Sequence, residues 1–191
     1  MDIELIKKEI SKNKVINKLV FFEELPSTQI YAKENSKNIK NGTIILANNQ
    51  TRGIGTKDRK WYSKENENLT FTIVLKPNEK INKFEYLTIR VAEIIIHTIN
   101  NFYNIRADIK VPNDIIINNR KVCGILTETE VKGENVENLF IGIGLNVNQK
   151  DFDIEIKNIA TSLFKETNKM IDKEYILINL ISEIDKLLKN N

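Results

Sequence analysis

Four segments of the chain carry polar or glycine residues that a packed core does not require, and each ends or interrupts an expected strand. These segments are Ser27–Thr28, the loop over 50–61, Lys110 to Asp114, and Gly142 to Asn148. Strand ends are where a sheet presents polar groups to a ligand, so the four segments could converge on one pocket. The sequence therefore predicts a ligand site assembled from distant parts of the chain.

The loop QTRGIGTKDRKW at 50–61 is suited to binding an anion. Its glycines let backbone N–H groups approach a phosphate, and its basic residues, Arg52, Lys57, Arg59 and Lys60, supply positive charge. The loop matches neither G-x-x-x-x-G-K-[ST] nor G-x-G-x-x-G. Taken alone, it indicates a phosphate cradle and a flexible solvated turn about equally.

The segment K-V-P-N-D at 110–114 leaves a lysine, Lys110, at a strand end, and Pro112 stiffens the bend that follows. A lysine in this position can bind a carboxylate or phosphate oxygen through a charge-assisted bond worth roughly 1.5–3 kcal/mol. A surface lysine before a Pro-Asn-Asp turn would give the same pattern. Both readings stay open on the residues alone.

Composition narrows the classes of protein. A chain of 191 residues that is 41% hydrophobic predicts one domain over 1–191, and a net charge of +3 gives no sign of a nucleic-acid coat. The only cysteine, Cys123, and the only histidine, His97, leave too few ligands for a structural zinc site and no Ser-His-Asp triad. We expect Cys123 to be a small core residue and His97 an ordinary helix residue. Apolar runs fall short of the roughly 20 residues that span a bilayer, so we expect a cytoplasmic chain.

The hydrophobic pattern predicts an α+β fold in which helices flank a mixed, largely antiparallel sheet. Asn118-Asn119 tolerates the positive φ of a two-residue hairpin turn, so the apolar runs on either side should pair. The other expected strands cover 19–25, 42–48, 69–77 and 138–148. The expected helices cover 28–38, capped by Ser27 or Thr28, then 84–104 and 173–190, after an amphipathic start through Ile10. A polar loop is expected over 49–68.

Six motifs occur in the order seen in biotin protein ligases. They are LPST at 25–28, a Q-T-x-G-x-G loop ending in R-K-W at 50–61, K-V-P-N-D at 110–114, R-K-V-C-G-I-L-T-E at 120–128, G-I-G-L-N-V-N at 142–148, and A-T-S-L at 160–163. From about Phe21 to Leu163 the chain resembles the catalytic domain of the biotin-[acetyl-CoA-carboxylase] ligase family, which has the class II synthetase-like fold of biotin and lipoate ligases.

The resemblance implies an adenylating ligase. Such enzymes join biotin to ATP as biotinyl-5'-AMP, release pyrophosphate, and transfer the biotinyl group to a lysine of a carboxyl carrier protein. It implies biotin as substrate, ATP and Mg²⁺ as co-substrate and ion, and no permanently bound cofactor. The implied partner is the biotin carboxyl carrier protein, with a possible homodimer and with neither DNA nor membrane.

Motif by motif, the resemblance assigns catalytic roles to Lys110 and Arg59. Lys110 would hold the biotin carboxylate and then the acyl-phosphate oxygens, and Arg59 would contact phosphate. Trp61 would pack on adenine, and Asp114 is a candidate magnesium ligand or part of a structural turn. The implied biotin-binding residues are Ser27, Thr28, Gln29, Gln50, Gly53, Ile54, Gly55, Thr56, Lys110 and Gly124. The implied nucleotide-binding residues are Arg59, Trp61, Asn113 and Asn146.

The sequence departs from the family pattern in the glycine loop and in the motif at 110–114. Ile54 and Thr56 stand where the usual loop has arginines, and Val111 stands where the usual residue is tryptophan. Arg52 and Lys57 lie beside the missing arginines. We therefore expect the loop to order over the adenylate but to hold it less tightly than an arginine-containing loop does.

The flanks differ from larger relatives as well. Twenty residues before Phe21 cannot build a winged helix, which argues against the dual ligase-repressor form, and the small β-barrel domain that commonly follows is not expected before Asn191. A shortened chain and a naturally short enzyme fit equally.

Two other functions stay open. One is lipoate or octanoate transfer by the related fold, although K-x-P-N-D with the Q-T-x-G-x-G loop favours biotin. The other is a non-catalytic binder that keeps the biotin or adenylate pocket. A comparison of biotin with lipoate binding, and an assay for the adenylate, separate the three.

Overall fold

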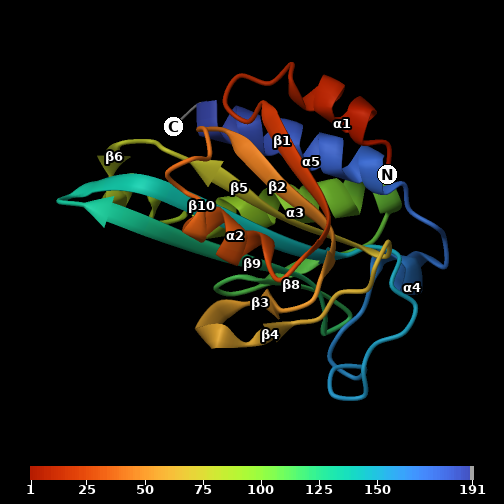
Figure 1. Ribbon diagram of the computed structural model, residues 1–191. Helices are drawn as coiled ribbons and strands as arrows, with labels where there is room; N and C mark the ends of the chain where they lie inside the picture. Colours follow the sequence, from red (N-terminus) through yellow and green to blue (C-terminus); the bar gives the residue numbers. More distant parts are fainter. Residues whose placement is uncertain (190–191) are drawn as a thin grey trace.

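The fold of the computed structural model, which describes residues 1–189, is built on an eight-stranded sheet (Figure 1). Its strands follow the order β1-β2-β5-β10-β9-β8-β7, with β6 pairing to β10. β1 and β2 run parallel and the other neighbours run antiparallel. The bounds are β1 Lys18–Leu25, β2 Thr43–Gln50, β5 Asn68–Leu75, β6 Glu79–Lys80, β7 Asp108–Lys110, β8 Asp114–Ile117, β9 Arg120–Lys132 and β10 Asn135–Asn146. The predicted mixed, largely antiparallel sheet is confirmed.

Helices cover both faces of this sheet (Figure 1). The main core lies under α1 (Ile3–Ile10), α3 (Leu87–Tyr103) and α5 (Lys173–Lys189), whereas α2 (Thr28–Glu34) packs on the other face. Successive side chains of a strand point to opposite faces, so Ile44 and Leu46 of β2 enter the main core and Ile45 packs under α2. Burial on both faces explains why the run over 44–47 in β2 is apolar without alternation.

Most predicted elements are present within a few residues of their expected ends. Of the helix predicted over 84–104, Phe84 belongs instead to a 3-10 turn, η2 (Ile81–Phe84), and the helix itself begins at Leu87; the helix predicted over 28–38 ends at Glu34. The last residue of the helix predicted over 173–190 lies outside the described residues. Asn118 and Asn119 have φ of 50° and 61°, which confirms the predicted hairpin between β8 and β9.

The polar loop predicted over 49–68 contains regular structure that the sequence did not reveal. β3 (Gly53–Ile54) pairs with β4 (Lys60–Trp61) around a 3-10 turn, η1 (Thr56–Asp58). We refer to residues 51–62 as the strap. Figure 1 shows its β3–β4 hairpin standing apart from the main sheet, next to the ends of the central strands.

The single histidine and the single cysteine occupy ordinary positions. His97 is exposed on α3 and interacts with Asn101. Cys123 is buried and free in β9, and burial raises the pKa of its thiol to about 12. Both positions agree with the structural roles expected for these residues. Within residues 1–189 no helix combines the length and apolar character that crossing a bilayer requires.

Candidate functional site

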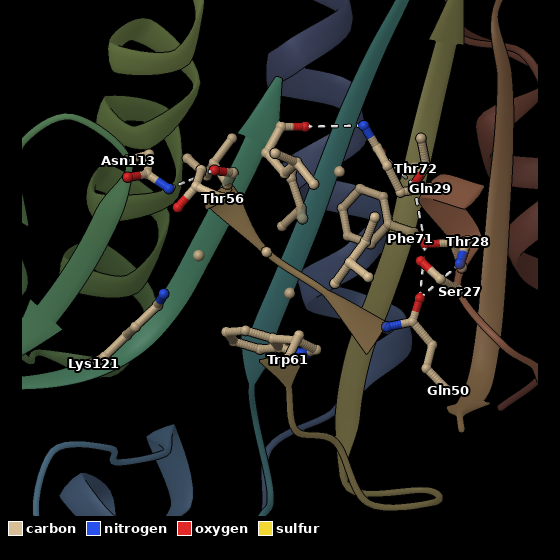
Figure 2. A pocket seen from close by; sticks show the side chains of 18 residues that line it. Ser27, Thr28, Gln29, Gln50, Thr56, Trp61, Phe71, Thr72, Asn113 and Lys121 are labelled. Carbon is tan, nitrogen blue, oxygen red and sulfur yellow. Dashed lines mark hydrogen bonds between the residues drawn. The ribbon is translucent and has the colours of Figure 1, made fainter. Parts of the chain in front are cut away.

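Two adjoining cavities lie at the strand ends where the four polar segments meet. The smaller has a volume of about 40 Å³ and the larger about 360 Å³. Gly55, Thr56, Trp61 and Lys121 line both. Figure 2 shows the smaller cavity, with Ser27, Thr28 and Gln50 on one side, Lys121 and Asn113 on the other, and Trp61 between them. The four segments therefore do come together, but they line two adjoining cavities where the sequence predicted one pocket.

A network of neutral side chains forms one end of the smaller cavity. The backbone N–H of Thr28 donates to Gln50 Oε1 at 2.7 Å, and the Thr28 hydroxyl lies 3.1 Å from the same oxygen. The hydroxyl of Thr72 lies 3.0 Å from Thr28 Oγ1 and 3.0 Å from Gln29 Oε1. The parallel pairing of β1 with β2 sets Leu25 opposite Gln50, so the turn after β1 brings Thr28 onto the end of β2.

The helix α2 is anchored to β9 beside this network. Gln29 Nε2 donates to Glu128 Oε2 at 2.9 Å, and Lys33 Nζ forms an ion pair with Glu128 Oε1 at 2.7 Å. Gly142 permits the contact, because a Cβ at this position would lie 2.6 Å from Gln29 Oε1. The amide of Gln29 is therefore engaged within the protein, while Ser27 caps the helix through a contact from Ile30 N.

Trp61 lies on a glycine surface and separates the two cavities. Gly124 and Gly144 are paired across β9 and β10, and a Cβ on Gly144 would lie 2.4 Å from Trp61 Cε2. A Cβ on Gly124 would lie 3.3 Å from Cζ3 of the same ring. The indole Nε1 is buried and has no hydrogen-bond partner within residues 1–189. The indole thus fills space above the sheet that the glycines keep free.

Lys121 is the cation at the junction of the cavities. Its Nζ lies 2.7 Å from Asp114 Oδ1 and 5.5 Å from the centre of the Trp61 ring. The β8–β9 register moves from Ile115 opposite Cys123 to Ile116 opposite Lys121, which leaves Val122 as an extra residue. A bulge of this kind redirects neighbouring side chains.

Lys110 occupies a different position from Lys121. It is exposed at the end of β7 and lines only the larger cavity, away from Ser27, Thr28 and Gln50. The sequence predicts a carboxylate-binding role for Lys110 and none for Lys121. The sequence does show a basic pair, Arg120-Lys121, directly before a buried run. That pattern does not predict the β-bulge that turns the Lys121 side chain into the site.

The larger cavity combines cations with one unpaired acceptor. Arg59, Lys60, Lys110 and Lys121 all line it. Asn146 is 3% exposed; its Nδ2 donates to the carbonyl of Thr161 at 3.0 Å, and its Oδ1 has no partner in the described part of the chain. A buried acceptor without a partner is suited to an N–H donor on a ligand.

A side-chain hydrogen bond joins the strap to the loop that follows β10. The Tyr62 hydroxyl donates to Glu155 Oε2 at 2.5 Å. This hydrogen bond raises the pKa of the Tyr62 phenol, because it favours the protonated form. Ile156 and Ile159 of the same loop line the larger cavity together with Tyr62.

The remaining residues predicted for biotin line the smaller cavity, and the remaining residues predicted for the nucleotide line the larger cavity, with two exceptions. Asn113, predicted for the nucleotide, lines the smaller cavity and donates through Nδ2 to Ile125 O at 2.9 Å. Gly53, predicted for biotin, lines neither, and a Cβ there would lie 2.7 Å from Trp61 O, so it serves the pairing of β3 with β4. The predicted biotin residues that do line the smaller cavity are Ser27, Thr28, Gln29, Gln50, Ile54, Gly55, Thr56 and Gly124.

Among the side chains that the structure describes, no three or more His, Cys, Asp or Glu residues form a group that could hold a metal ion. Asp114, the candidate magnesium ligand, is the only carboxylate among the described residues that line the larger cavity, and it pairs with Lys121. Mg²⁺ commonly binds through one or two carboxylates together with substrate phosphates. The donor set therefore fits a metal that arrives with a polyphosphate and does not fit a cage built by the protein alone.

The comparisons with known proteins define the family to which this fold belongs. The family described as Biotin/lipoate A/B protein ligase matches residues 21–146, and the chain belongs to it. The family predicted from the order of the motifs is confirmed.

The relatives and solved structures that match the chain include ligases named for biotin. The chain is 37% identical over 171 residues to the bifunctional ligase/repressor BirA of Bacillus subtilis, covering 88% of this chain and 53% of that protein. Its structure matches the biotin protein ligase from Aquifex aeolicus in complex with biotin and ATP with a TM-score of 0.78 at 33% identity, covering 91% of this chain and 71% of the other. A biotin–[acetyl-CoA-carboxylase] ligase of Paracoccus denitrificans is 29% identical over 63% of this chain and 51% of its own length. The chain thus spans about half the length of the curated relatives it matches.

Proposed function

We propose that this chain carries the catalytic part of a biotin-protein ligase. It activates biotin with ATP to biotinyl-5'-AMP and pyrophosphate, and then transfers the biotinyl group to a lysine of a carboxyl carrier protein. The observation that carries the proposal is the joining of a small neutral cavity to a larger cationic one, with Lys121 lining both. A molecule with a polar ring at one end and a carboxylate at the other would present its carboxylate at this junction.

The neutral network supports recognition of the ureido ring of biotin. A ureido group has one carbonyl acceptor and two N–H donors, and hydroxyl and amide groups of Ser27, Thr28 and Gln50 offer the complementary set. These groups are mostly buried, so a ligand that leaves one unpaired would lose about 1–3 kcal/mol. The same penalty disfavours lipoate and octanoate, which lack the ureido group.

Binding of biotin requires movement at the junction. A cavity of about 40 Å³ holds a few water molecules, which is too little for a fused bicyclic ring. Trp61 fills the adjacent space and belongs to the strap, so the strap with its indole is the element that must shift.

Lys121 is proposed to assist the first reaction step. A carboxylate oxygen of biotin attacks the α-phosphorus of ATP, the bond to the bridging oxygen breaks, and pyrophosphate leaves with that electron pair. An ammonium at the junction stabilises the charge that develops on the transferred phosphoryl group. Asp114, 2.7 Å from Lys121 Nζ, orients the ammonium before the substrates arrive. The role that sequence reasoning gave to Lys110 is therefore proposed for Lys121.

The larger cavity is proposed to bind the nucleotide. Arg59, Lys60 and Lys110 are cations suited to the phosphates, and the unpaired Oδ1 of Asn146 is suited to an exocyclic amine such as that of adenine. Asp114 is the carboxylate that would contact Mg²⁺ bound to the phosphates, where the metal would neutralise charge. In the second step the amine of the carrier lysine attacks the acyl carbon, and AMP leaves.

The test is incubation of the full chain with ATP, Mg²⁺ and labelled biotin, with and without a biotin carboxyl carrier domain. The expected results are ATP-dependent labelled adenylate in both reactions and labelled carrier in the second. Absence of adenylate would overturn the enzyme assignment. Because Trp61 is the only tryptophan in the chain, its fluorescence gives a binding signal independent of turnover, and a fluorescence response without adenylate would indicate the non-catalytic binder.

The same reaction with lipoate or octanoate in place of biotin separates the related ligase function. Efficient adenylation of either acid, with none of biotin, would favour that alternative. A cytoplasmic location and a homodimer remain parts of the proposal that cell fractionation and sedimentation would test.

A further inference from the structure

Glu166 is a buried carboxylate that takes no part in the cavities. It lies in α4 (Leu163–Thr167), and its side chain is 6% exposed. Arg120 Nη2 lies 2.7 Å from Oε1, Asn118 Nδ2 donates to Oε2 at 2.8 Å, and the Thr161 hydroxyl also hydrogen-bonds to Oε1. Burying a carboxylate is unfavourable unless several donors compensate it, and here three side chains do so.

The three donors lie on both flanks of Lys121. Asn118 and Arg120 precede Lys121 in the β8–β9 hairpin, while Thr161 belongs to the segment that runs beside it. Lys121 N donates to Ile159 O at 2.7 Å, and Thr161 N donates to Lys121 O at 2.8 Å. Both hydrogen-bonding groups of the Lys121 backbone therefore depend on the position of residues 159–161.

The bulge makes this support necessary. The β8–β9 register shifts at Val122, so Arg120 and Lys121 pair with Ile117 and Ile116 in a short ladder that is out of step with the rest of β9. Without a partner on its other edge, the start of β9 would be free to tilt. A tilt would displace the lysine ammonium, and a misplacement of about 1 Å is enough to reduce catalysis.

We infer that Glu166 is a positioning residue for Lys121: by joining Arg120 and Thr161, it holds the bulged start of β9 against residues 159–161 and so sets where the ammonium enters the site. This inference rests on the proposed function, because it concerns the adenylation step. It assigns Glu166 no contact with biotin or ATP. Loss of the Glu166 charge should therefore lower the rate of adenylation and leave the affinity for biotin unchanged.

Glu166→Gln is the main test, with Asp185→Asn as its matched control. Asp185 is also a buried carboxylate with three donors, the backbone N–H groups of Lys14, Val15 and Ile16, at 3.1, 2.8 and 2.7 Å. It lies in α5 and lines neither cavity. Both variants are assayed by labelled pyrophosphate exchange at a temperature where circular dichroism shows each fully folded.

For Glu166→Gln we expect kcat to fall about tenfold with the KM for biotin within about twofold, because only the junction is displaced. Asp185→Asn should lower the melting temperature and leave kcat unchanged. If both variants keep the parent kcat, or if both lose it equally, the positioning role is wrong. Should Glu166→Gln fail to fold, Thr161→Val, which removes one donor and keeps the shape, should lower kcat about threefold, and an unchanged kcat would count against the inference.

A double-mutant cycle tests whether Glu166 acts through Lys121. In a Lys121→Ala chain, adding Glu166→Gln should alter the residual exchange rate by less than about twofold, since the ammonium it positions is gone. A full tenfold further loss would mean that Glu166 acts elsewhere. An inactive parent chain would overturn the proposed function and this inference together, whereas an active parent with an insensitive Glu166→Gln overturns the inference alone.

Discussion

At the smaller cavity the polar side chains are neutral, mostly buried and held by one another, whereas at the larger cavity they are mainly exposed cations. Ser27, Thr28 and Gln29 are 1%, 4% and 3% exposed, and Thr72 is fully buried. Arg59, Lys60 and Lys110 are exposed. The same sheet therefore carries two kinds of recognition, separated by one indole and one lysine.

The difference teaches how the two substrates are distinguished. Buried neutral groups discriminate by the cost of leaving a donor or acceptor unpaired, so they select a particular ring. Exposed cations attract any polyphosphate and are weakened by salt, so they supply affinity with little selectivity. Under the proposed function, the junction at Lys121 is the point at which a selected acid would meet a nucleotide that is held mainly by charge.

The sharpest way to break the comparison is to remove the cation at the junction. Lys121→Ala should lower kcat for adenylation by about 10²–10³, the loss typical of a single group that stabilises transition-state charge. Lys110→Ala, its matched control on the larger cavity, should change kcat by less than about fivefold, with most of its effect on the KM for ATP. Pyrophosphate exchange measures both. A larger loss from Lys110→Ala would instead support the role predicted from the sequence.

The neutral end should respond to loss of a single amide. Gln50→Leu keeps approximate size but removes the acceptor that holds Thr28, so the Kd for biotin should rise about 5–150-fold, equivalent to about 1–3 kcal/mol. Calorimetric titration with biotin gives this value. Titration of the same variant with ATP serves as the control and should be unchanged; equal weakening of both ligands would show that the two ends are not independent.

Salt should separate the two cavities without any substitution. Raising the ionic strength from about 0.05 to 0.5 M shortens the Debye length to a few ångströms, so the KM for ATP should rise severalfold. The Kd for biotin should change by less than about twofold, because its ring contacts are neutral. Steady-state kinetics give the KM for ATP, and titration gives the Kd for biotin, across the salt series. An equal rise of both constants would show that the two cavities do not differ in their dependence on charge.

The smallest effect is expected from adding charge to the strap. Thr56 lines both cavities where the family pattern has an arginine, so Thr56→Arg should slow release of biotinyl-5'-AMP by about two- to tenfold. Release can be followed by rapid filtration of labelled adenylate, with Thr56→Gln as a neutral control of similar length. Equal retention in the parent and in Thr56→Arg would contradict the expectation that this loop holds the adenylate loosely.

Local sequence signals predicted much of the site because they act over a few residues. The positive φ at Asn118 and Asn119 depends on the two residues themselves, so the hairpin could be read directly. The same local signals predict Ser27 or Thr28 as the cap of the following helix, and Ser27 is the cap. The β3–β4 pairing of the strap escaped prediction because strands of two residues carry no periodic pattern.

The amino-acid sequence by itself determined the fold class, the family and which segments meet at the strand ends, because strand periodicity, turn residues and motif order are properties of neighbouring residues. The tertiary structure decided which lysine lies at the junction. Lys110 and Lys121 are both lysines at strand ends in the sequence, and only the bulge at Val122 and the edge contact with residues 159–161 turn one of them between the cavities. A register shift is a relation between strands, so no single strand encodes it.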